Sequence, residues 1–81
     1  MLSDYIKAAM HHATYEILGD GTFYGEIPNF QGVWGNAETL EACREELQSA
    51  LEDWMLVRIG DRSCLPIVDG INLNQPQPEV A

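Results

Sequence analysis

The sequence predicts one α+β domain in which a long helix packs on one face of an antiparallel sheet. Two observations support this prediction. Residues 14–27 contain two segments rich in β-branched and aromatic residues on either side of a Gly-Asp-Gly turn, which is the pattern of a β-hairpin. Residues 39–60 instead repeat apolar residues every three or four positions, as an amphipathic helix does. The complete predicted order of elements is α-β-β-β-α-β.

A short helix is expected near the N-terminus, over residues 3–13. Ser3 is a good N-cap, and Asp4 is favourable in the first turn of a helix because its charge complements the helix dipole. Apolar residues recur at three- and four-residue steps after it. One face of this helix therefore needs a partner surface. The sheet face opposite the long helix is expected to be covered either by this helix or by a second copy of the chain.

The hairpin follows, with strands expected over residues 14–18 and 22–27. Gly19, Asp20 and Gly21 are expected to supply the positive φ that a tight turn needs at little steric cost. Successive side chains of a strand point to opposite faces of a sheet, so alternation predicts which side chains lie away from the helix and meet solvent or a partner. These side chains are Glu16, Tyr24 and Glu26.

Pro28 ends the second strand because it has no N–H to donate, and a third strand is expected over residues 33–35. The long helix then begins after Thr39, a suitable N-cap, and ends at Gly60. Its predicted apolar stripe runs from the first turn to the last. The members of this stripe are Leu40, Cys43, Leu47, Ala50, Leu51, Trp54 and Val57.

A fourth strand is predicted over residues 64–68, at the edge of the sheet or with a bulge because it contains Pro66. Residues 72–81 are dominated by Asn, Gln and Pro, which bury too little apolar surface to compensate for the entropy lost on ordering. We expect a single domain over residues 1–71, followed by a flexible tail.

The charge of the chain limits its possible partners. Thirteen acidic residues against four basic ones give a formal net charge of -9. Binding to nucleic acid depends on clustered Lys and Arg, so direct nucleic-acid binding is not expected, and a basic partner is favoured. Two cysteines are too few for a disulfide scaffold, and we find neither a signal-peptide pattern nor a membrane span. These features favour a cytoplasmic protein.

Few residues offer catalytic or metal chemistry. His11 and His12 are neighbours on a predicted helix, where their side chains diverge, and Cys43 and Cys64 lack the close spacing of a zinc site. Glu16 and Glu26 are conceivable carboxylates of a metal-dependent nuclease, but such sites need several converging acids. We therefore expect no enzyme activity, no metal and no cofactor.

An ordered series of motifs over residues 19–55 resembles the HicB antitoxin family. The series is a glycine-rich turn followed by an aromatic residue, a strand that ends in acid-hydrophobic-Pro, a glycine-containing loop and a Thr-Leu-Glu-Ala helix start. It is filled by Phe23, Glu26, Ile27, Pro28, Phe30, Gly32, Thr39, Leu40, Glu41 and Ala42. The resemblance also extends to Leu65, Pro66 and Ile67.

The resemblance implies a degraded ribonuclease H-like fold without catalytic acids, which binds and neutralises a small basic HicA-like ribonuclease toxin. The acidic charge agrees with such a partner. The alternative is an orphan domain of the same fold that forms homo-oligomers and has no toxin partner. The residues expected to contact a partner are Glu16, Tyr24, Glu26, Glu38 and Asp61, and those expected in self-association are Phe30, Trp34 and Trp54.

Overall fold

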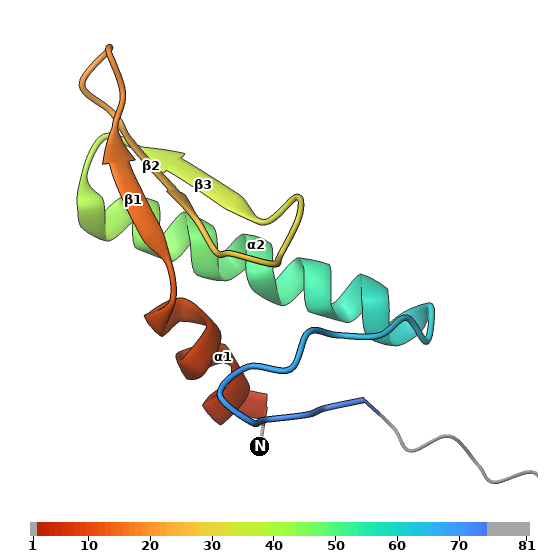
Figure 1. Cartoon of the computed structure of the whole chain (residues 1–81). Coiled ribbons are helices and arrows are strands. Elements are labelled where there is room, and N and C mark those ends of the chain that lie inside the picture. Colours follow the sequence, from red (N-terminus) through yellow and green to blue (C-terminus); the bar gives the residue numbers. More distant parts are fainter. Residues whose placement is uncertain (1, 75–81) are drawn as a thin grey trace, which may run out of the picture.

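Residues 2–74 of the chain are described by a computed structural model, in which helices and strands follow in the order α-β-β-β-α (Figure 1). The elements are α1 (Leu2–His11), β1 (Thr14–Ile17), β2 (Phe23–Glu26), β3 (Trp34–Ala37) and α2 (Leu40–Gly60). The predicted α+β class, with a long helix on one face of an antiparallel sheet, is confirmed. Within residues 2–74, no helix combines the length and the apolar composition needed to cross a bilayer.

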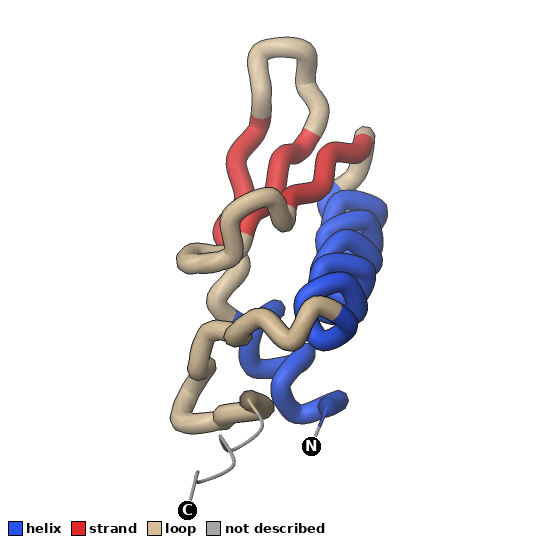
Figure 2. The backbone as a smooth tube through the Cα atoms, turned by 90° about the vertical axis from the view of Figure 1, so that its right-hand side faces the viewer, coloured by secondary structure: helices blue, strands red, loops and turns tan. Residues whose placement is uncertain are grey.

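The three strands form an antiparallel sheet in the order β1-β2-β3, and α2 covers one of its faces (Figure 2). Gly25 of β2 pairs with Tyr15 of β1 and with Gly35 of β3, and all three lie on the face that meets the helix. The strand residues that alternate with these three point to the other face of the sheet, which we call the outer face. It consists of Thr14, Glu16, Tyr24, Glu26, Trp34 and Asn36.

The helix α2 is capped and buried as its sequence predicts over most of its length. The Thr39 hydroxyl accepts a hydrogen bond of 3.0 Å from the Ala42 N–H. Every fourth residue then faces the sheet or the core, and the four that are buried are Cys43, Leu47, Leu51 and Met55.

The ends of the predicted apolar stripe do not follow this prediction. Leu40 is 48% exposed and Val57 is 63% exposed, so neither belongs to the core. Leu40 is the first residue of α2, so no preceding turn of the helix covers it. Met55 takes the core position at the other end, and Val57, two residues further, is rotated by roughly 200° around the helix axis.

The helix α1 does not cover the sheet. It extends the hydrophobic core beyond the end of the sheet. Among the described residues it packs on α2, and it contacts none of the strands (Figure 1). Tyr5 and Phe30 meet there with ring centroids 6.3 Å apart, and Phe30 also lies 5.1 Å from the Trp54 ring. The core cluster comprises Tyr5, Ala9, Met10, Ile27, Phe30, Val33, Leu47, Leu51, Met55, Leu65 and Val68.

The predicted strand over residues 64–68 is absent, and this segment is irregular. Pro66 has no N–H, and the polar groups around it are bonded elsewhere. The Leu65 N–H donates to Asn74 Oδ1 at 2.7 Å, and Asn74 Nδ2 donates to the Leu65 carbonyl at 3.0 Å. The Tyr5 hydroxyl donates to the Pro66 carbonyl at 2.6 Å. The Tyr5 bond joins the segment to α1, and the Asn74 bonds occupy the Leu65 backbone groups that a strand ladder would use.

Residues 72–74, which fall in the predicted tail, bond to one another and to Leu65. Val68 and Ile71 form an isolated antiparallel bridge, and the Asn74 N–H donates to Asn72 Oδ1 at 2.9 Å. Asn72 and Asn74 thus take part in the fold. The remainder of the predicted tail, residues 75–81, lies outside the described residues.

Candidate protein-binding surface

The outer face of the sheet combines acidic and aromatic side chains. Neither helix lies over it, because α2 occupies the opposite face and α1 packs beyond the end of the sheet (Figures 1 and 2). Its side chains include two carboxylates, Glu16 and Glu26, and two large aromatic rings, Tyr24 and Trp34. The basic residues of the chain belong to the helices or to the turn after α2. The outer face is thus aromatic and acidic without a cation of its own.

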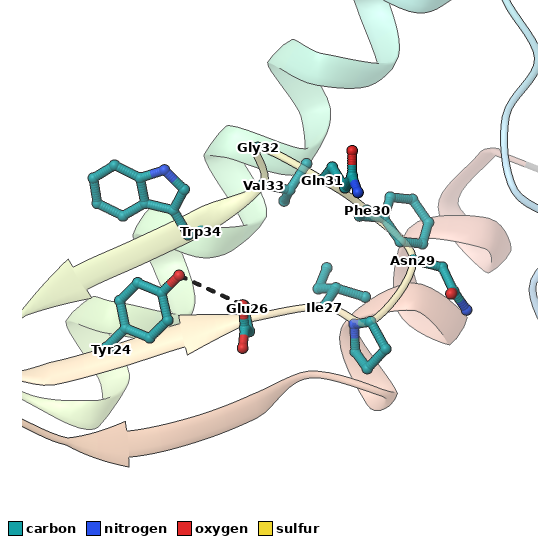
Figure 3. Close-up of a pocket in the computed structure, with 10 residues that line it drawn as sticks. Tyr24, Glu26, Ile27, Asn29, Phe30, Gln31, Gly32, Val33 and Trp34 are labelled. Carbon is teal, nitrogen blue, oxygen red and sulfur yellow. Dashed lines mark hydrogen bonds between the residues drawn. The ribbon is translucent and has the colours of Figure 1, made fainter.

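Alternation along β2 and its register with β3 bring the aromatic rings together. Glu26 pairs with Trp34 across the two strands, and Tyr24 lies two residues before Glu26, so all three side chains share the outer face. The Tyr24 and Trp34 rings stack with centroids 6.1 Å apart and planes inclined by 23° (Figure 3). Trp34 nevertheless remains 54% exposed. The stack therefore presents an open indole surface beside a carboxylate.

Tyr24 is also electrostatically coupled to the acids around it. Its hydroxyl donates a long hydrogen bond of 3.5 Å to Glu26 Oε2. Partial removal from water raises the pKa of the Tyr24 phenol above its ordinary value, and the negative charges of Glu26 and Glu16 raise that pKa further. Both effects favour the neutral phenol, which is the form that donates the hydrogen bond to Glu26.

A hollow of about 430 Å³ adjoins this stack, between the end of β2 and the start of β3 (Figure 3). It is formed where the chain turns through residues 27–33, with Asn29 and Gly32 in the left-handed region at φ 72° and 87°. Apolar, amide and carboxylate groups all contribute to its wall. Its lining residues are Tyr24, Glu26, Ile27, Pro28, Asn29, Phe30, Gln31, Gly32, Val33 and Trp34.

The structure brings together only part of the residues predicted to contact a partner. Glu16, Tyr24 and Glu26 share the outer face. Glu38 lies after β3, at the end of the sheet away from Glu26, and Asp61 is the C-cap of α2. These last two belong to other parts of the surface.

The three residues predicted for self-association occupy different environments. Phe30 is only 4% exposed and belongs to the core. Trp54 is half-buried beneath Arg58, whose guanidinium carbon lies 4.8 Å from the centroid of the Trp54 ring. Trp34 alone of the three presents a large exposed ring, and it does so next to the predicted partner-binding residues.

The residues considered for metal chemistry do not converge in the described part of the chain. No group of three or more His, Cys, Asp or Glu side chains is arranged to hold a metal ion within residues 2–74. His12 Nε2 instead lies 2.7 Å from Asp69 Oδ1, beside a second hollow of about 260 Å³ that α1 lines together with residues 27–30 and 66–69. Cys43 is buried, where loss of water contact raises the pKa of its thiol.

A substitution at Glu26 tests the electrostatics of the outer face. We expect Glu26→Gln to lower the pKa of the Tyr24 phenol, although not to its ordinary value, because burial is the larger cause of the shift. Glu16→Gln is the matched control and should lower it less. The measurement is an NMR pH titration of tyrosine labelled at Cζ. Equal shifts in the two variants would contradict the described geometry.

The sign of the linked stability effect follows from the same shift. A group whose pKa is higher in the folded state than in the unfolded state stabilises the fold when it is protonated. This stabilisation is fully present at pH values below the unfolded pKa. For Tyr24 this contribution is lost as the pH rises through its raised folded value.

Comparison with known proteins identifies the family of this chain. The model of the UPF0150-like family matches residues 4–66, and the chain belongs to that family. The crystal structure of TTHA0281 from Thermus thermophilus is similar to it, with a TM-score of 0.87 and 36% sequence identity. The match covers 94% of this chain and 95% of that one. A search of curated proteins gives no match.

Proposed function

We propose that this UPF0150-like domain is a protein-binding module of the HicB antitoxin type, which neutralises a small basic HicA-like ribonuclease. The uncovered outer face, on which the stacked rings of Tyr24 and Trp34 lie beside carboxylates, is the observation that supports this proposal most directly. Rings of this kind supply contact area at little entropic cost, as is typical of energetically important interface residues.

Electrostatics explain how such a module would inhibit a ribonuclease. A surface that binds RNA is cationic because it contacts phosphates. Glu16 and Glu26 would take the place of those phosphates and cover the RNA-binding surface of the toxin. The net charge of -9 would accelerate the encounter, and added salt would slow it. On this proposal the domain acts by occlusion and performs no reaction itself.

The alternative, a homo-oligomer without a toxin partner, is favoured by a different surface. Leu56 is 70% exposed, Val57 is 63% exposed and Ile59 is 51% exposed, all in the last turns of α2. Apolar side chains grouped at the end of a helix are suited to pairing with a second copy. This surface lies on the helix layer and not on the outer face, so the two functions predict different interfaces.

The test is a pull-down of the tagged full chain from its native cell extract, at low and at high salt, with mass identification of what is bound. We expect a small basic protein that is released by salt. Glu16→Gln with Glu26→Gln should abolish its capture, whereas Glu45→Gln with Asp53→Asn, the matched charge loss on α2, should not. Recovery of the chain alone would favour the homo-oligomer.

A further inference from the structure

We propose that the hollow beside the Tyr24–Trp34 stack is a receptor for a guanidinium group, and that it takes an arginine side chain presented by a basic partner. This inference deepens the proposed function by naming the group that is recognised. The hollow itself is tested independently of any toxin. Three features carry the inference: the exposed stacked rings, the carboxylate beside them and the size of the hollow.

The rings and the carboxylate together select a cation. The face of an indole is electron-rich and attracts a cation within about 6 Å of the ring centroid. Trp34 is stacked on Tyr24 yet remains 54% exposed, so part of the indole is open to a ligand. Glu26, the cross-strand partner of Trp34, places a negative charge next to it. An anion would be repelled by the Glu26 charge and by the electron-rich face of the indole, and a neutral ligand would not neutralise the Glu26 charge.

Arginine fits this site better than lysine does. A planar guanidinium stacks on an aromatic ring and donates several hydrogen bonds from its edge, whereas an ammonium is a compact, strongly hydrated point charge. Acceptors for such an edge are available in the Glu26 carboxylate and in the side-chain amides of Asn29 and Gln31, which line the hollow (Figure 3). At about 430 Å³ the hollow falls within the range of small-ligand pockets.

A pairing of an arginine with an indole ring also occurs within the chain. The Arg58 guanidinium lies over the Trp54 ring at 4.8 Å and also donates from Nε to the Cys64 carbonyl at 3.0 Å. An arginine that stacks on one indole while its edge is hydrogen-bonded to an oxygen is the arrangement inferred for the partner at Trp34. No basic residue of the chain fills the place at Trp34, since the cations within residues 2–74 are in the helices or follow α2.

The experiment uses the full chain and three short peptides that differ at one central residue, which is arginine, lysine or citrulline. Citrulline has the shape of arginine but no charge. Binding is followed by two-dimensional NMR, with the Trp34 and Trp54 indole N–H signals and the backbone amides of Glu26 and Gln31 as reporters. We expect the arginine peptide to shift the Trp34, Glu26 and Gln31 signals and to leave Trp54 unchanged. The citrulline peptide should bind at least about fivefold more weakly.

Variants separate this site from general attraction to an acidic protein. Glu26→Gln and Trp34→Leu should each lower the affinity for the arginine peptide by about fivefold or more. Glu45→Gln on α2 should leave this affinity unchanged. Circular dichroism confirms that each variant is folded. Equal binding of citrulline, equal effects of Glu26→Gln and Glu45→Gln, or a stronger response of Trp34 to a single-stranded RNA oligonucleotide would overturn the inference.

Its failure is distinguishable from failure of the proposed function. A basic protein captured from the extract by a chain whose hollow ignores arginine would leave the antitoxin-type role intact and remove the guanidinium site. Arginine binding without a captured protein would leave the guanidinium site intact and remove the antitoxin-type role.

Discussion

Replacement of Gly35 by alanine is expected to destabilise the domain by about 3 kcal/mol, because the sheet and α2 leave no room for an added methyl group. A Cβ at Gly35 would lie 2.7 Å from the Leu47 amide nitrogen and 2.9 Å from the Cys43 carbonyl oxygen. Both are backbone atoms of a helix, so no side-chain rotation relieves the clash. The helix must instead move away from β3.

This movement would also weaken contacts around the site. The Cys43 thiol donates to the Gly35 carbonyl at 3.4 Å, and Leu47 is fully buried at the same crossing. Since β3 also carries Trp34, a shifted strand would alter the stack on Tyr24. We therefore expect the Gly35→Ala variant to lose peptide binding at the outer face together with stability.

Equilibrium urea denaturation measures the first effect, and the matched control is Gly19→Ala. A Cβ at Gly19 has no atom within 4 Å, and its φ does not lie in the left-handed region. Its stability should change by less than about 1 kcal/mol. For a domain of this size, a loss of about 3 kcal/mol corresponds to a fall of roughly 12 °C or more in Tm. A Gly35→Ala variant as stable as the control would show that the sheet and α2 pack less closely than described.

Local patterns predicted the central elements of this fold. The hairpin over residues 14–27 and the helix after Thr39 depend on turn chemistry, capping and periodicity, which are properties of short segments. The segment over 64–68 was wrongly predicted to be a strand. Its composition suits a strand, but its polar groups bond to Tyr5 and Asn74, and no local pattern reveals these distant partners.

The candidate site was only partly predictable for the same reason. Alternation along the hairpin correctly grouped Glu16, Tyr24 and Glu26 on one face. The place of Trp34 depends on the register of β3 against β2, which is set by how the intervening loop folds. Two residues in that loop with positive φ, Asn29 and Gly32, set this path; both residue types favour turns, but a turn signal does not specify the register of the strands that it joins. The hollow next to the stack was therefore not predicted.

The sequence suggests that Phe30 lies at an interface between copies of the chain, whereas the structure places it in the core, and a substitution of Phe30 distinguishes the two. Aromatic content alone suggested a role in self-association, yet its ring is buried between Tyr5 and Trp54. We expect Phe30→Ala to destabilise the domain by about 3–5 kcal/mol, through lost contacts and the cavity left behind. Such a loss is a large part of the stability of a small domain.

The concentration dependence of unfolding decides between a core and an interface role for Phe30. If the ring stabilises each copy from within, the difference in unfolding free energy between the variant and the original chain is the same at low and high protein concentration. A ring that joined two copies would give a difference that grows with concentration, because association stabilises the folded state by mass action. Trp34→Ala is the control: the residue is 54% exposed, and the loss of its ring should cost less than about 1 kcal/mol. A small, concentration-dependent effect at Phe30 would place that residue at an interface and would require a different packing of the loop that carries it.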